Sequence, residues 1–106
     1  MPLTRDFNHT VRARAQRDSA FRKSLLREAL EVLMSGDVET GKILLRDYIN
    51  ATLGFAGLAE LSRIPPKSLM RMFGADGNPR AENLFAVIEL LQENEGVRFE
   101  LRSRTA

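Results

Sequence analysis

Apolar residues recur at helical spacing over two long stretches of the chain. Between residues 18 and 36 they follow one another at intervals of four, which predicts an amphipathic helix with Asp18 as its N-cap and Gly36 as its C-terminal stop. A second stripe between residues 37 and 54 predicts another helix, which Asp37 caps and Gly54 ends. The apolar positions of the two stripes are Phe21, Leu25, Ala29 and Leu33, then Leu44, Leu45, Tyr48, Ile49 and Thr52.

Three further helices are predicted in the second half of the chain, over residues 55–63, 66–73 and 80–92. Two prolines, Pro65 and Pro66, separate the first two, because proline is tolerated in the first turn of a helix but not in its interior. Residues 74–79 are dense in turn-forming residues, so they predict a loop before the last helix.

The two ends of the chain show different patterns. Residues 1–17 are polar and basic without a clean period, so we expect an arm outside a helical domain over residues 18–96. Residues 97–102 alternate apolar and charged, which predicts a β-strand within a C-terminal segment at 97–106. A single strand needs a partner for its backbone, and a second copy of the chain is the favoured one; the alternative is a frayed polar tail. The residues expected to face each other in such a homodimer are Val97, Phe99 and Leu101.

Composition narrows the classes of function. A chain of 106 residues makes one domain, and the absence of cysteine excludes disulfides, iron–sulfur clusters, thiolate zinc sites and a cysteine nucleophile. With a single histidine, a multi-histidine metal site is not expected, so we predict a binding protein without metal or cofactor and not an enzyme. No apolar run approaches the roughly 18 residues of a membrane span, and the first residues lack an apolar signal core. We therefore expect a cytoplasmic protein without membrane contact.

The net charge of +2 is unevenly distributed along the sequence. Residues 1–27 carry +5 and residues 63–80 carry +3, whereas residues 28–62 and 81–97 carry −4 each and the last nine carry +2. Thirteen of the sixteen basic residues are arginine, the residue suited to bidentate recognition of phosphate and guanine. This distribution favours a polyanionic partner; the alternative is that the arginines solvate helix faces.

The two short helices joined by a tight turn have the outline of a helix-turn-helix. Ala59 is small where the helices approach, Ile64 lies in the turn, and Leu69 and Met72 face inward. Arg63 stands at a turn position that usually holds glycine, because the backbone there is left-handed. The residues expected to contact DNA are Lys67, Ser68, Met70 and Arg71 from the second helix, Arg63 from the turn, and Asn78 and Arg80 from the following loop, where the Gly77 N–H is also expected to bind phosphate.

The stretch from Leu58 to Arg80 resembles the Cro and phage-repressor type of helix-turn-helix, a lambda-repressor-like fold. Within that superfamily, the loop Asp76-Gly77-Asn78-Pro79 and the apolar residues from Asn83 to Ile88 resemble the addiction-module antidote (antitoxin) proteins. The helix predicted over residues 66–73 departs from that family, because it has Leu69-Met70 where the family tends to have leucine–tyrosine. The resemblance covers residues 18–92 and implies an antitoxin that neutralises a RelE-like toxin and represses its own promoter at double-stranded operator DNA.

The expected fold is therefore all-α, a five-helix helix-turn-helix domain with a short C-terminal strand. A stand-alone phage-type repressor without a toxin partner is the main alternative function. A protein–protein adaptor, which uses the helix pair only for packing, is another. A small enzyme would need an acid–base pair such as His9 with Asp6 or Glu93 with Glu95.

Overall fold

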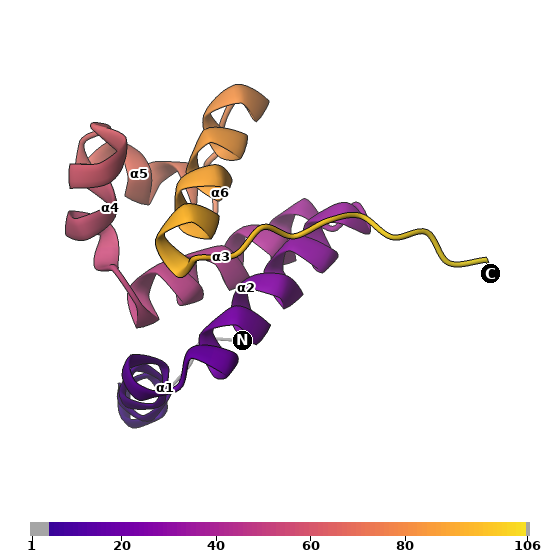
Figure 1. Cartoon of the computed structure of the whole chain (residues 1–106). Helices are drawn as coiled ribbons and strands as arrows, with labels where there is room; N and C mark the ends of the chain where they lie inside the picture. Colours follow the sequence, from indigo (N-terminus) through magenta and orange to yellow (C-terminus); the bar gives the residue numbers. More distant parts are fainter. Residues whose placement is uncertain (1–4, 106) are drawn as a thin grey trace.

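The chain folds into six helices in the computed structural model, which describes residues 5–105 (Figure 1). No strand occurs in this range, so the prediction of an all-helical fold is confirmed. Nor is any helix within it long and apolar enough to cross a membrane. The helices are α1 (Arg5–Arg17), α2 (Ser19–Met34), α3 (Val38–Ala51), α4 (Gly54–Ser62), α5 (Pro66–Met72) and α6 (Ala81–Glu95).

Helices α2 and α3 begin at the aspartates that the sequence predicts. The Asp18 carboxylate accepts a hydrogen bond from the Phe21 N–H at 3.1 Å, and Asp37 accepts one from the Thr40 N–H at 3.1 Å. Hydrogen bonds to the charged carboxylate hold both pKa values below the usual 3.8. The Phe21 N–H does so for Asp18, and the Thr40 side chain together with the Thr40 N–H does so for Asp37. Both caps therefore stabilise the helices fully above that usual value, and their contribution is lost as the pH falls through the folded-state pKa.

The core is made by apolar side chains from five of the helices. Leu26 of α2 and Leu45 of α3 are fully buried, and α4, α5 and α6 each add at least one fully buried leucine. Phe73, just after α5, packs against Phe55 of α4 with ring centroids 6.3 Å apart. The largest fully buried side chains are Tyr48, Phe73, Leu26, Leu45, Ile49, Leu58, Leu69, Leu91 and Val87.

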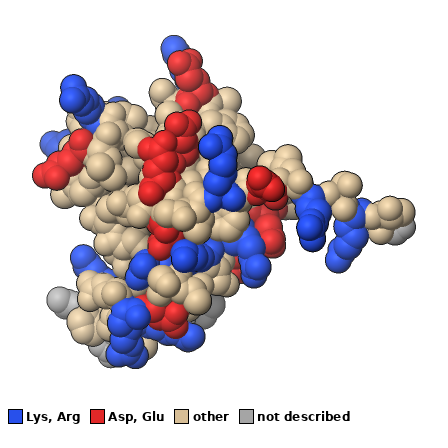
Figure 2. Space-filling view, viewed as in Figure 1, with Lys and Arg blue, Asp and Glu red and all other residues tan. Residues whose placement is uncertain are grey.

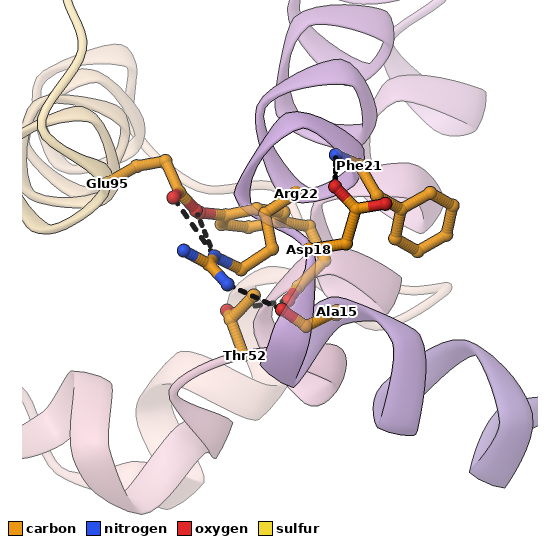
Figure 3. Close-up of polar contacts among 7 residues, drawn as sticks. Ala15, Asp18, Phe21, Arg22, Thr52 and Glu95 are labelled. Carbon is orange, nitrogen blue, oxygen red and sulfur yellow. Dashed lines mark hydrogen bonds and ion pairs between the residues drawn. The ribbon is translucent and has the colours of Figure 1, made fainter.

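A buried ion pair joins α2 to the end of α6. The Glu95 side chain is only 4% exposed, and its two oxygens lie 3.2 and 3.0 Å from the Arg22 Nε. The Tyr48 hydroxyl of α3 donates a further hydrogen bond to Glu95 at 2.5 Å. Arg22 also donates to the backbone carbonyl of Ala15 in α1 at 2.6 Å, and Figure 3 shows its guanidinium between the two acceptors. Burial, together with this bond to a carboxylate, raises the pKa of Tyr48.

The prediction of an arm outside the helical domain at residues 1–17 is wrong for residues 5–17, because they form α1. Residues 1–4 lie outside the described part of the chain. Ala15 is fully buried, and the Arg14 guanidinium lies 4.4 Å from the centre of the Phe21 ring. The helix therefore docks through one small apolar residue, a backbone carbonyl and a cation–π contact. None of these contacts produces a repeating apolar pattern in the sequence.

The strand predicted at residues 97–102 is also wrong, since this segment is extended but pairs with no strand in the described chain. Val97 and Phe99, which were expected to face a second copy, pack against the chain's own core, while Leu101 is 83% exposed. Gln92 of α6 supplies two of the hydrogen bonds that a neighbouring strand would provide. Its carbonyl accepts from the Val97 N–H at 3.0 Å, and its side-chain oxygen accepts from the Phe99 N–H at 2.8 Å.

We predict that Arg22→Met lowers the free energy of unfolding by about 3 kcal/mol, because it leaves the buried Glu95 carboxylate without its cation. The matched control is Arg27→Met, since Arg27 pairs with Glu31 at 3.7 Å on the surface, where both side chains are more than half exposed. The control is expected to cost less than about 0.5 kcal/mol. Urea denaturation measures both values, and equal losses in the two variants would contradict this role of Arg22.

Candidate functional site

The connection between α4 and α5 is a three-residue turn in which Arg63 is left-handed, with φ 63° and ψ 18°. Arg63 is the one non-glycine residue with positive φ in the described chain. Its N–H donates to the Ala59 carbonyl at 2.8 Å, and the Ser62 hydroxyl accepts from the Ile64 N–H at 3.1 Å. These bonds hold the turn although it lacks the usual glycine, and they leave the Arg63 side chain exposed.

The inner face of the α4–α5 pair joins the core. Leu58 and Leu69 are fully buried against it, as the sequence predicts for Leu69. Ile64 in the turn and Met72 at the end of α5 are half-buried. The orientation of α5 is thereby set, since its apolar side is covered and its opposite side faces outward.

The outward face of α5 is basic. Lys67 and Arg71 are exposed and lie four residues apart, so they share one side of the helix. Met70 is 53% exposed, whereas Ser68 is half-buried, so three of the four predicted contact residues of this helix are exposed. Neither Lys67 nor Arg71 forms an ion pair with a residue in the described part of the chain.

The loop between α5 and α6 is held by a buried lysine that the sequence analysis did not single out. Lys42 of α3 is 2% exposed, and its ammonium group donates to the Gly77 carbonyl at 2.6 Å and to the Gly74 carbonyl at 3.4 Å. The Glu39 carboxylate lies 3.3 Å from the same nitrogen. A side chain at Gly77 would overlap the Arg71 carbonyl, so the loop folds tightly over the end of α5.

The expectation that the Gly77 N–H binds phosphate is wrong, because this group donates to the Gly74 carbonyl at 3.0 Å. Asn78 and Arg80 are both exposed, as a role in binding would require. Arg80 is the N-cap residue of α6, so its side chain branches from the electropositive end of that helix. The loop thus offers side chains, and not the glycine backbone, to an anion.

Basic charge lies in two separate places on the molecule. Helix α1, with exposed Arg12, Arg14 and Arg17, lies at the end of the molecule opposite α5 (Figure 1). Lysine and arginine side chains gather in the same region at the bottom of Figure 2. The positive charge of α1 therefore does not extend the basic face of α5.

Glu93 and Glu95, one of the acid–base pairs considered from the sequence, have different surroundings in the structure. Glu95 is held by Arg22 and Tyr48, whereas Glu93 is exposed. His9 is exposed on α1, and the side chain of Asp6 lies outside the described residues. Within the described chain no group of three or more histidine, aspartate or glutamate residues is placed to hold a metal ion.

We predict that Lys42→Met loosens the loop at residues 74–78, because it removes the ammonium donor from two carbonyl groups. Unfolding free energy should fall by about 2 kcal/mol. Amide hydrogen exchange should accelerate in the loop, but less in the body of α2. Lys23→Met, at a half-buried lysine of α2, is the control and should leave exchange of the loop unchanged. Unaltered loop exchange in Lys42→Met would contradict this attachment.

Comparison with known proteins does not assign this surface to a family. The chain matches no protein-family model, no curated protein and no solved structure. The features available for assigning a function are therefore the exposed basic face of α5, the left-handed turn before it and the loop held by Lys42.

Proposed function

We propose that the chain is a DNA-binding protein in which α4 and α5 form a helix-turn-helix and α5 enters the major groove. The observation that carries this proposal is the pair of exposed cations, Lys67 and Arg71, on the outward side of a helix whose inner side is fixed in the core. Helix α5 has seven residues, so it is about 10 Å long, and the major groove is about 12 Å wide.

The side chains of this surface have complementary tasks in DNA recognition. Arg71 is suited to a bidentate contact with guanine, and Lys67 to guanine or phosphate. Exposed Met70 offers an apolar contact to the methyl group of thymine, and half-buried Ser68 offers a hydroxyl at the edge of the surface. The prolines at the start of α5 supply no hydrogen-bond donor, so base reading is concentrated in its later residues.

Residues on either side of α5 would contact the phosphate groups. Arg63 extends from the turn before the helix, and Asn78 and Arg80 extend from the loop after it. Such contacts fix the register of a protein on DNA without reading its sequence. Arg80 has the further benefit of the α6 N-terminus, where the helix dipole favours an anion.

The resemblance to addiction-module antidotes supports a more specific role. We propose an antitoxin that neutralises a RelE-like toxin and represses the promoter shared by the two genes. The chain would act as a homodimer on an operator with inverted repeats, with half-sites separated by about one helical turn. A stand-alone repressor is the second candidate, because the DNA-binding surface is the same in both. Co-expression with the product of a neighbouring gene, with growth rescue as the readout, distinguishes them.

We predict that Lys67→Ala/Arg71→Ala weakens binding to DNA from upstream of the chain's own gene. Arg71→Ala alone should cost about 1–3 kcal/mol and relax the preference at one base pair. Each lost phosphate contact should reduce the slope of log K against log salt by about 0.9. Fluorescence anisotropy over a salt series measures both quantities.

The matched control is Arg12→Ala/Arg17→Ala, which removes the same charge from α1. It should leave the preference for operator DNA unchanged. If this control loses as much affinity as the α5 variant, the interface is wrongly placed. Weak binding that is insensitive to salt in the unaltered protein would favour the adaptor role instead.

A further inference from the structure

An apolar groove of about 400 Å³ lies on the part of the surface formed by the end of α2, the start of α3, α6 and the C-terminal segment. Four large apolar side chains of its lining are exposed: Met34 at 62%, Phe85 at 61%, Val38 at 48% and, in the C-terminal segment, Leu101 at 83%. Apolar surface concentrated in this way marks an interaction site. Its floor and walls also include Leu33, Leu84, Ile88 and Phe99.

The charge around the groove restricts what can occupy it. Helix α6 contains no basic residue, and its exposed Glu82 and Glu89 lie about one turn on either side of Phe85. Glu89 also lines a neighbouring hollow, together with Glu93 and Arg98. Exposed Asp37 precedes α3 beside Val38 of the opposite wall. Figure 2 shows acidic side chains over α6. An occupant that combines apolar and basic side chains would therefore fit this groove best.

The chain itself carries such a segment. Residues 100–105 follow Phe99 and are here named the C-terminal arm. Glu100 and Leu101 line the rim of the chain's own groove, and the rest of the arm extends away from the helices (Figure 1). The arm exposes Leu101, at 83%, and the arginines Arg102 and Arg104. Its backbone makes no hydrogen bond to the described backbone, and neither arginine forms an ion pair with a described residue.

We propose that the groove binds the C-terminal arm of a second copy of this chain. Leu101 of each arm would leave the rim of its own groove and enter the groove of the other copy, with Arg102 and Arg104 near the glutamates of that copy's α6. Such an exchange is self-complementary, because each copy supplies one arm and one groove about a two-fold axis. It differs from pairing of two C-terminal strands, since the arm meets side chains of α2, α3 and α6. The inference gives the proposed homodimer an interface, and it does not depend on DNA binding.

Sedimentation without DNA tests the interface. The unaltered chain should be a dimer, and two variants should raise its dissociation constant at least about tenfold. Phe85→Glu places a charge in the groove, and truncation after Phe99 removes the arm. Both leave Val97 and Phe99 on the core, and circular dichroism checks that they are folded. Leu61→Glu, at a 49% exposed residue of α4 outside the groove, is the control and should remain dimeric. A monomeric wild type, or a dimer that survives truncation, would overturn the proposal.

Cross-linking tests where the arm lies, and the absence of native cysteine removes any background. A tagged chain with Leu101→Cys is mixed with an untagged chain with Phe85→Cys and oxidised, so that a disulfide between tagged and untagged chains joins two copies. This mixed product is expected for Phe85→Cys and not for the control Leu61→Cys. Equal yields with the two partners, or no mixed product with Phe85→Cys, would refute arm exchange. Either outcome leaves the DNA-binding proposal standing, because neither measurement involves DNA.

Discussion

Four helices of the described chain are joined by one polar network around the buried carboxylate of Glu95. A buried charge of this kind is very costly unless a cation and hydrogen bonds balance it, and Arg22 and Tyr48 provide both. Arg22 in turn holds the carbonyl of Ala15, so the position of α1 depends on the same guanidinium. Because Glu95 is the last residue of α6, this network also sets where the C-terminal segment leaves the helix.

A second polar attachment lies before α6, where Lys42 holds the loop that follows α5. The two attachments act from the same α2–α3 pair, one on each end of α6. The loop between α5 and α6 therefore cannot move freely, and α5 is fixed on one side by this loop and on the other by the hydrogen-bonded turn at Arg63. A rigid exposed helix loses little entropy on binding, which suits the recognition of a groove of fixed shape.

Much of the fold follows from local sequence signals, because the apolar period and the caps act within a few residues. The starts of α2 and α3 at Asp18 and Asp37 are examples. Helix α1 was missed because its docking uses the small residue Ala15 and a backbone carbonyl. The period-two pattern after Gly96 put Val97 and Phe99 on one side of the segment, but that side packs on the chain's own core and not on a second copy. It could not show whether a partner strand was present, since that depends on the rest of the chain.

The candidate site was only partly predictable, for a related reason. Exposure of Lys67 and Arg71 follows from the helical period once Leu69 is inside. The burial of Lys42 and Glu95 does not, because a charged residue in a helix usually faces water and its pairing partner is distant in sequence. The hydrogen bond from the Gly77 N–H to the Gly74 carbonyl likewise forms only in the folded loop, so the sequence could not reveal it.

The central claim is that DNA meets the outward face of α5, and NMR mapping of the amide signals during a DNA titration tests it most directly. The account predicts the largest shift changes from Arg63 to Arg71 and from Asn78 to Arg80, with small changes in α1. These changes should weaken together as salt is raised. Changes confined to Arg12, Arg14 and Arg17 of α1, or no saturable change on α5, would contradict the account.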